Sequence, residues 1–93
     1  MALIDDKNFT QVTDNQWVQL LQGEGIITNM GGLKQDIKFR FDNNIPNAQD
    51  AHRLLLGTES DNENSFVNED SNSSVYGKSR FGKVNILVTR NVI

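Results

Sequence analysis

The 93-residue chain contains no cysteine and only one histidine, His52. Without cysteine it has no disulfide framework, no thiolate metal ligand and no thiol nucleophile. No stretch reaches the roughly 18 apolar residues of a membrane span. The first residues also lack the basic and apolar regions of a signal peptide. We therefore expect no membrane partner.

Catalytic and metal-binding patterns are also missing. A Ser-His-Asp arrangement would have to use His52, but no serine lies in a G-x-S-x-G context. Residues 61–64 and 68–70 carry oxygen ligands that suit Ca²⁺, although the EF-hand pattern and its central glycine are absent. We predict that the protein is not an enzyme and that it has no cofactor and no metal site.

What the sequence does contain is alternation of apolar and polar residues. In the segment 37–41, Ile37, Phe39 and Phe41 fall on one side of an extended chain, and the lysine and arginine between them fall on the other. Val84, Ile86 and Val88 repeat this pattern near the C-terminal end. Further strands are expected over 9–13, 16–21, 25–30, 54–56 and 74–80. About seven short strands predict an all-β fold, namely a single antiparallel β-sandwich, with a small barrel as the alternative.

The length fits one domain. We expect a flexible N-terminal arm over residues 1–8, because its apolar tip is followed by a polar stretch. The β-sandwich domain then covers residues 9–93. Within it, residues 58–74 are expected to form a long acidic loop.

Charge is unevenly distributed along the second half of the chain. Residues 58–74 hold five acids and no base, whereas residues 75–93 hold four bases and no acid. Opposite charges of this kind favour head-to-tail contact between copies, or docking on a charged scaffold. The alternative is an ordinary solvated surface. The residues predicted to make such contacts are Phe66, Lys78, Arg80, Lys83, Val92 and Ile93. For Phe66 the alternative is that it pins the loop 58–74 to the body of the domain.

Two other ligand classes follow from the aromatic and basic residues. Trp17 and Tyr76 could form a platform for a sugar ring, although a lone tryptophan on a strand also suits a core. Lys38, Arg40 and the C-terminal bases could bind nucleic acid, but the isoelectric point of about 4.9 argues against this. We therefore predict no nucleic-acid partner.

A family resemblance adds to this interpretation. The segments that carry it are FTQVT (9–13), WVQL (17–20), IITN (26–29), IKFRF (37–41), IP (45–46), AHRLL (51–55), VYGKS (75–79) and VNILVT (84–89). Their order resembles the small β-sandwich virion proteins of tailed bacteriophages, which decorate capsids or build fibres and tail parts. The likeness covers most of residues 9–90, and the loop 58–74 is longer than expected for such proteins.

The resemblance implies a non-enzymatic structural protein of a bacteriophage particle, such as a capsid decoration or cement protein or a tail or fibre component. Its partners would be other virion proteins of the capsid, portal or tail, and it would act as a homo-oligomer. It would be made in the host cytoplasm and end in the virion. Two alternatives remain open at this point. One is a carbohydrate- or receptor-binding module, and the other is a small phage inhibitor that masks a host protein.

Overall fold

The computed structural model describes residues 2–32, 35–47, 49–57 and 64–92. These residues form nine strands and no helix, so they contain no helix that could cross a membrane. The strands are β1 (Ala2–Asp5), β2 (Thr10–Val12), β3 (Val18–Gln22), β4 (Gly25–Asn29), β5 (Ile37–Asp42), β6 (Arg53–Leu55), β7 (Ser65–Asn68), β8 (Ser74–Ser79) and β9 (Val84–Val92).

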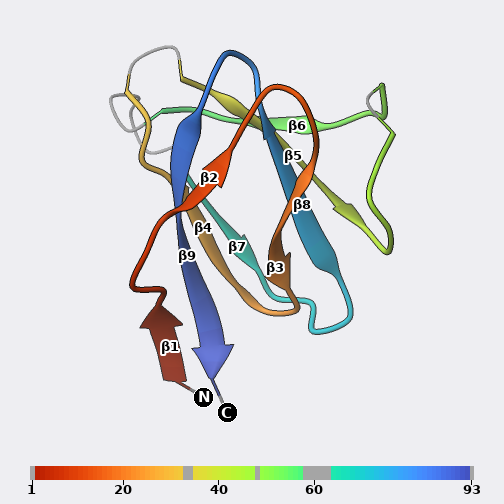
Figure 1. Cartoon of the computed structure of the whole chain (residues 1–93). Coiled ribbons are helices and arrows are strands. Elements are labelled where there is room, and N and C mark those ends of the chain that lie inside the picture. Colours follow the sequence, from red (N-terminus) through yellow and green to blue (C-terminus); the bar gives the residue numbers. More distant parts are fainter. Residues whose placement is uncertain (1, 33–34, 48, 58–63, 93) are drawn as a thin grey trace.

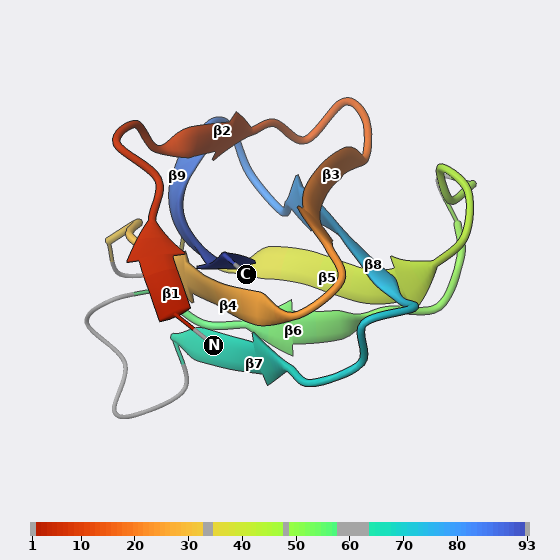
Figure 2. The ribbon, with the colours of Figure 1, turned by 90° about the horizontal axis from the view of Figure 1, so that it is seen from below.

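The strands form two antiparallel sheets that pack against each other (Figures 1 and 2). In the first, called sheet A, β1 and β2 both pair with β9, followed by β4 and β7. In the second, called sheet B, the order is β3-β8-β5-β6. The predicted all-β sandwich is confirmed, and the alternative of a small barrel is wrong because the sheets do not close.

Two strands lie where none was expected. β1 occupies half of the segment predicted as a flexible arm, residues 1–8, and pairs with the end of β9 from Ala2↔Val92 to Asp5↔Thr89. The Thr89 hydroxyl donates to the Asp5 carboxylate, and Arg90 forms a 2.7 Å ion pair with Asp6. These contacts tie down polar residues that the sequence pattern assigns to a free terminus.

The second unexpected strand, β7, interrupts the segment predicted as one acidic loop, residues 58–74. It pairs with β4 from Gly25↔Asn68 to Thr28↔Ser65. Phe66 lies opposite the fully buried Ile27, so it shares the inner face of sheet A. A single inward phenylalanine, with Asn68 two residues later, is enough to hold this short strand against the body.

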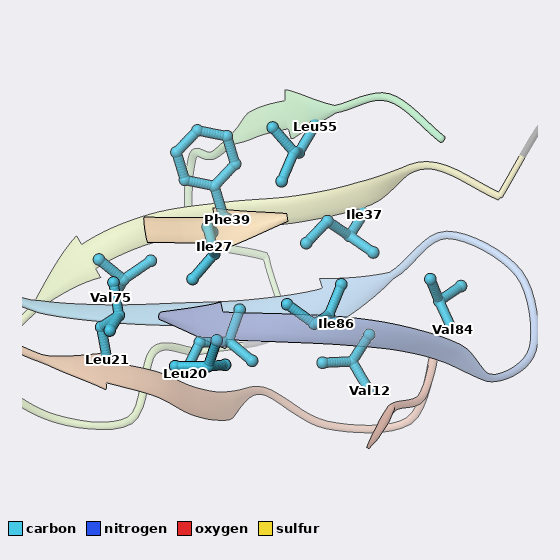
Figure 3. Packing of buried hydrophobic residues seen from close by; sticks show 11 residues of the cluster. Val12, Leu20, Leu21, Ile27, Ile37, Phe39, Leu55, Val75, Val84 and Ile86 are labelled. Carbon is cyan, nitrogen blue, oxygen red and sulfur yellow. The ribbon is translucent and has the colours of Figure 1, made fainter. Parts of the chain in front are cut away.

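The core lies between the two sheets and is almost entirely aliphatic (Figure 3). The predicted inward residues Ile37, Phe39, Val84, Ile86 and Val88 are all buried, which confirms the parity assigned to both strands. Phe41 is half-buried and packs on the edge of this cluster. Leu20 and Leu21 are both buried because the register of β3 against β8 shifts between Gln19 and Leu21.

Two buried asparagines fix the connections between the sheets. Asn29 donates from Nδ2 to the Gln35 and Leu55 carbonyls at 2.7 and 3.1 Å, and its Oδ1 accepts the Gly31 N–H. Asn68 donates from Nδ2 to the Gly23 carbonyl at 2.8 Å. Buried amides with such partners satisfy backbone groups that the strands leave unpaired. Gly23 itself has a φ of 89°, which a side chain would strain.

Candidate functional site

Phe66 is not the surface anchor predicted from the sequence. Its ring centroid lies 4.8 Å from that of Phe39 and 5.4 Å from that of Phe41. It is therefore half-buried against the hydrophobic core. This placement follows from the register of β7, which turns Phe66 inward and Val67 outward.

The aromatic pair Trp17 and Tyr76 also lies elsewhere than a sugar platform requires. Each side chain is only 6% exposed. The Trp17 Nε1–H donates to the Asn47 carbonyl at 3.1 Å, so the indole lies against the connection between β5 and β6. Tyr76 lies opposite Gln19 on one side and Arg40 on the other, in the middle of sheet B. Neither ring offers an open face on which a sugar could stack.

The predicted basic residues separate into two groups. Lys78 lies on the outer face of sheet B directly opposite Lys38. Arg80 and Lys83 instead flank the β8–β9 turn and are exposed. Val92 is the last residue of β9, opposite Ala2, and Ile93 lies outside the described residues. Of the five predicted contact residues that the structure describes, only Arg80 and Lys83 lie at the same turn.

The β8–β9 turn presents an apolar residue that the prediction of contact residues omitted. Phe81 is 67% exposed, and the guanidinium of Arg80 lies over its ring at 5.6 Å. Two hydrogen bonds to Gly82 fix the turn. The Ser79 hydroxyl donates to the Gly82 carbonyl, and the Asp14 carboxylate accepts the Gly82 N–H. Gly82 has a φ of 64°, which glycine adopts without strain. The turn therefore holds Phe81 outward rather than leaving it on a loose loop.

A second exposed apolar surface lies on the outer face of sheet A. An open hollow of about 250 Å³ is lined by Leu3, Glu24, Gly25, Ile26, Val67, Asn68, Glu69 and Asn91. Leu3 is 55% exposed and Val67 is 53% exposed, and Ile26 lies opposite Val67. Glu24 and Glu69 are the charged residues of this lining. We call this feature the sheet A hollow.

The sheet A hollow is built on fixed connections. Asn91 donates to Glu24 from Nδ2 at 2.8 Å, which links β9 to the β3–β4 turn. Asn68 links the same turn to the β7–β8 connection through the Gly23 and Asp70 carbonyls. The Asn72 backbone N–H, and then the Ser73 hydroxyl, hold the pKa of the Asp70 carboxyl below its ordinary value. The negative charge at this end of the molecule is thus stabilised by nearby donors.

Two other hollows contain ion pairs formed within the chain. One of about 300 Å³ is lined by Arg40, Phe41, Ala51, His52 and Arg53. The Arg40 guanidinium lies 3.2 Å from Asp42 and 3.8 Å from Asp50. A polar one of about 470 Å³ contains the Asp6–Arg90 ion pair. Within the described residues, no group of three or more His, Cys, Asp or Glu side chains could hold a metal ion.

Two exposed surfaces therefore combine apolar and charged groups, as surfaces suited to protein contact do. The β8–β9 turn exposes Phe81 beside Arg80 and Lys83, and the sheet A hollow exposes Leu3 and Val67 beside two glutamates. A signal for Phe81 was present in the sequence, as an aromatic residue next to glycine between two strands. The hollow had no such signal, because Leu3, Ile26 and Val67 come from three separate strands. No family model, curated protein or solved structure matches this chain.

Proposed function

We propose that this chain is a non-enzymatic structural protein of a bacteriophage particle, which binds other virion proteins through exposed apolar surfaces. The observation that carries the proposal is the pair of surfaces just described. Leu3, Val67 and Phe81 are each more than half exposed on a domain of 93 residues. Clustered exposed apolar residues with a charged rim mark sites of protein association.

The part of the proposal that assigns the chain to a bacteriophage particle rests on the sequence resemblance. The resemblance is to small β-sandwich virion proteins of tailed phages, and the two-sheet antiparallel fold agrees with the fold that this resemblance implies. The hydrogen bonds of the Asn29 and Asn68 amides to backbone carbonyls suit a rigid building block. A capsid decoration protein and a tail or fibre component both meet this description. In either case the chain would be made in the host cytoplasm and would end in the virion.

The carbohydrate-binding alternative has less support, because it depended on Trp17 and Tyr76 as an exposed pair, and both are buried. Masking of a host protein by a phage inhibitor would use the same apolar surfaces. It differs from the virion proposal in where the chain is found after infection. The copy number in particles therefore separates these two functions.

The test is quantitative mass spectrometry of purified particles of the phage that encodes this chain. We expect the chain in a fixed ratio to the major capsid or tail protein, and we expect it to survive washing that removes host proteins. Detection only in the host lysate, bound to a host protein, would contradict the proposal. A His52→Ala variant should be incorporated like the parent, since His52 is exposed. Its Nδ1 lies 3.2 Å from the Asp50 carbonyl, and its ring lies 6.4 Å from that of Trp17. Enzymatic turnover lost in this variant, with the fold kept, would also contradict it.

A further inference from the structure

We propose that copies of this chain bind head to tail, with Phe81 of one copy inserted into the sheet A hollow of the next. This inference rests on the proposed function, because it names a partner for the same exposed surfaces. The occupant is a second copy of the chain. Position, size and charge each support the assignment.

Position comes first. Figure 1 shows the β8–β9 turn at one end of the sandwich, and the β3–β4 turn, the β7–β8 connection and β1 at the other. Because the turn and the elements that line the hollow lie at opposite ends of the sandwich (Figure 1), the turn cannot reach the hollow of its own chain without unfolding. Contact between the two features therefore requires another molecule. Such a contact joins different patches, so it generates a ring or an open string rather than a symmetric pair.

Size supports a phenyl ring as the occupant. An enclosed apolar cavity of roughly 150 Å³ accepts a benzene ring. The sheet A hollow is open to solvent and has about 250 Å³, and the apolar side chains of Leu3, Ile26 and Val67 contribute to its lining. Since Phe81 is 67% exposed in the free chain, most of its ring would leave water on insertion. The bonds that Ser79 and Asp14 make to Gly82 hold the turn in place and reduce the entropy lost on binding.

Charge supports the same pairing. The hollow has Glu24 and Glu69 on its rim, whereas Arg80 and Lys83 flank Phe81. Asp14 and Asp36 also lie near the turn, but each already has a partner in its own chain. Asp36 lies 3.5 Å from Arg80, and Asp14 accepts the Gly82 N–H. Lys83 is exposed beside the aromatic anchor, where it can meet an acid on the next copy.

The test uses sedimentation velocity of the full chain over a wide concentration series. The parent should associate beyond the 10.5 kDa of one chain as concentration rises. Phe81→Ser, which removes the inserted ring, and Val67→Asp, which charges the hollow, should each weaken association about tenfold or more. Both side chains are exposed, so circular dichroism and thermal melting should show an intact fold. Leu3→Asp provides a second hollow variant if Val67→Asp fails that control.

Mixing the two variants gives the decisive result. The Val67→Asp chain keeps its turn and the Phe81→Ser chain keeps its hollow, so together they should form one-to-one dimers that cannot grow further. A Glu69→Lys, Lys83→Glu double variant should associate more tightly than either single variant. The inference is overturned if the parent stays monomeric, if either variant associates like the parent, or if the mixture forms no dimer. Because no particles are used, a monomeric chain that is still found in virions would refute head-to-tail binding and leave the proposed function standing.

Discussion

β7 and the β8–β9 turn each carry one phenylalanine, and the two side chains lie in opposite surroundings. Phe66 belongs to Ser65–Asn68, and Phe81 lies between Arg80 and Gly82. Phe66 packs on Phe39 and Phe41, whereas Phe81 extends into solvent. The difference comes from strand pairing, since β7 is in register with β4 and the turn has no strand beside it. The fate of an isolated aromatic residue thus depends on long-range register and not on its sequence neighbours.

The largest effect that tests this comparison is on folding stability. Phe66→Ala should lower the free energy of unfolding by about 2–3 kcal/mol, somewhat less than truncation of a fully buried phenylalanine. Its matched control, Phe81→Ser, should change that free energy by less than about 0.5 kcal/mol. Urea denaturation with an unchanged m value measures both. Equal destabilisation by the two substitutions would mean that the two phenylalanines do not differ in burial as described.

A second prediction concerns the other inward residue of β7. Asn68→Ala should cost about 1–3 kcal/mol, because it leaves the Gly23 carbonyl and the Asp70 N–H without their partner. Asn72→Ala is the control, since that side chain is exposed in the same connection. Chemical denaturation of both variants is the measurement. If the two substitutions cost the same, the Asn68 amide does not fix the connection.

A smaller effect is expected on the pH dependence of folding stability, through Asp70, which follows β7. The Asn72 N–H and the Ser73 hydroxyl lower the pKa of Asp70 from its ordinary value of 3.8, so the folded chain favours the carboxylate. The resulting stability is present above that ordinary value and is lost as pH falls through the lowered one. Asp70→Asn should therefore be less stable than the parent at neutral pH, and the difference should shrink below about pH 3.8. A difference that is constant with pH would show that ionisation of Asp70 does not contribute.

The smallest expected change in folding stability concerns the basic residues, and it compares Lys78 in β8 with Lys83 in the turn. Lys78 and Lys38 lie directly opposite each other, and like charges in that position are unfavourable. Lys78→Glu should therefore raise stability by about 0.2–1 kcal/mol, and added salt should reduce the gain. Lys83→Glu, in the exposed turn, should give no such gain. A stability loss from Lys78→Glu at low salt would mean that the two lysines are not cross-strand neighbours.

Much of the fold follows from the sequence, because alternation over 37–41 and 84–88 is unambiguous. Ile37, Phe39, Val84, Ile86 and Val88 are buried as expected. β1 and β7 could not be found this way, since each is only four residues long and lies beside a polar stretch, without a clear alternation of its own. They form because β9 and β4 offer unpaired edges, and that information lies elsewhere in the chain.

The candidate site was less accessible to sequence reasoning. Charge segregation identified Arg80 and Lys83 at the turn, but it also grouped Lys78 with them, and Lys78 lies on the outer face of sheet B. The alternation of strand residues sends Val67 out and Phe66 in, which requires the register of β7 against β4. Three apolar residues from separate strands contribute to the lining of the sheet A hollow, and the sheet order places them together.

The position of β9 has a consequence for how the chain folds. This nine-residue strand pairs with β1 and β2 on one edge and with β4 on the other, so residues 84–92 form the middle of sheet A. During synthesis, sheet A cannot assemble until this late segment has emerged, and β4 keeps an open edge until then. Pairing of Ala2 with Val92 also closes nearly the whole chain into one loop. Such nonlocal pairing predicts slow folding and a period in which exposed strand edges favour aggregation.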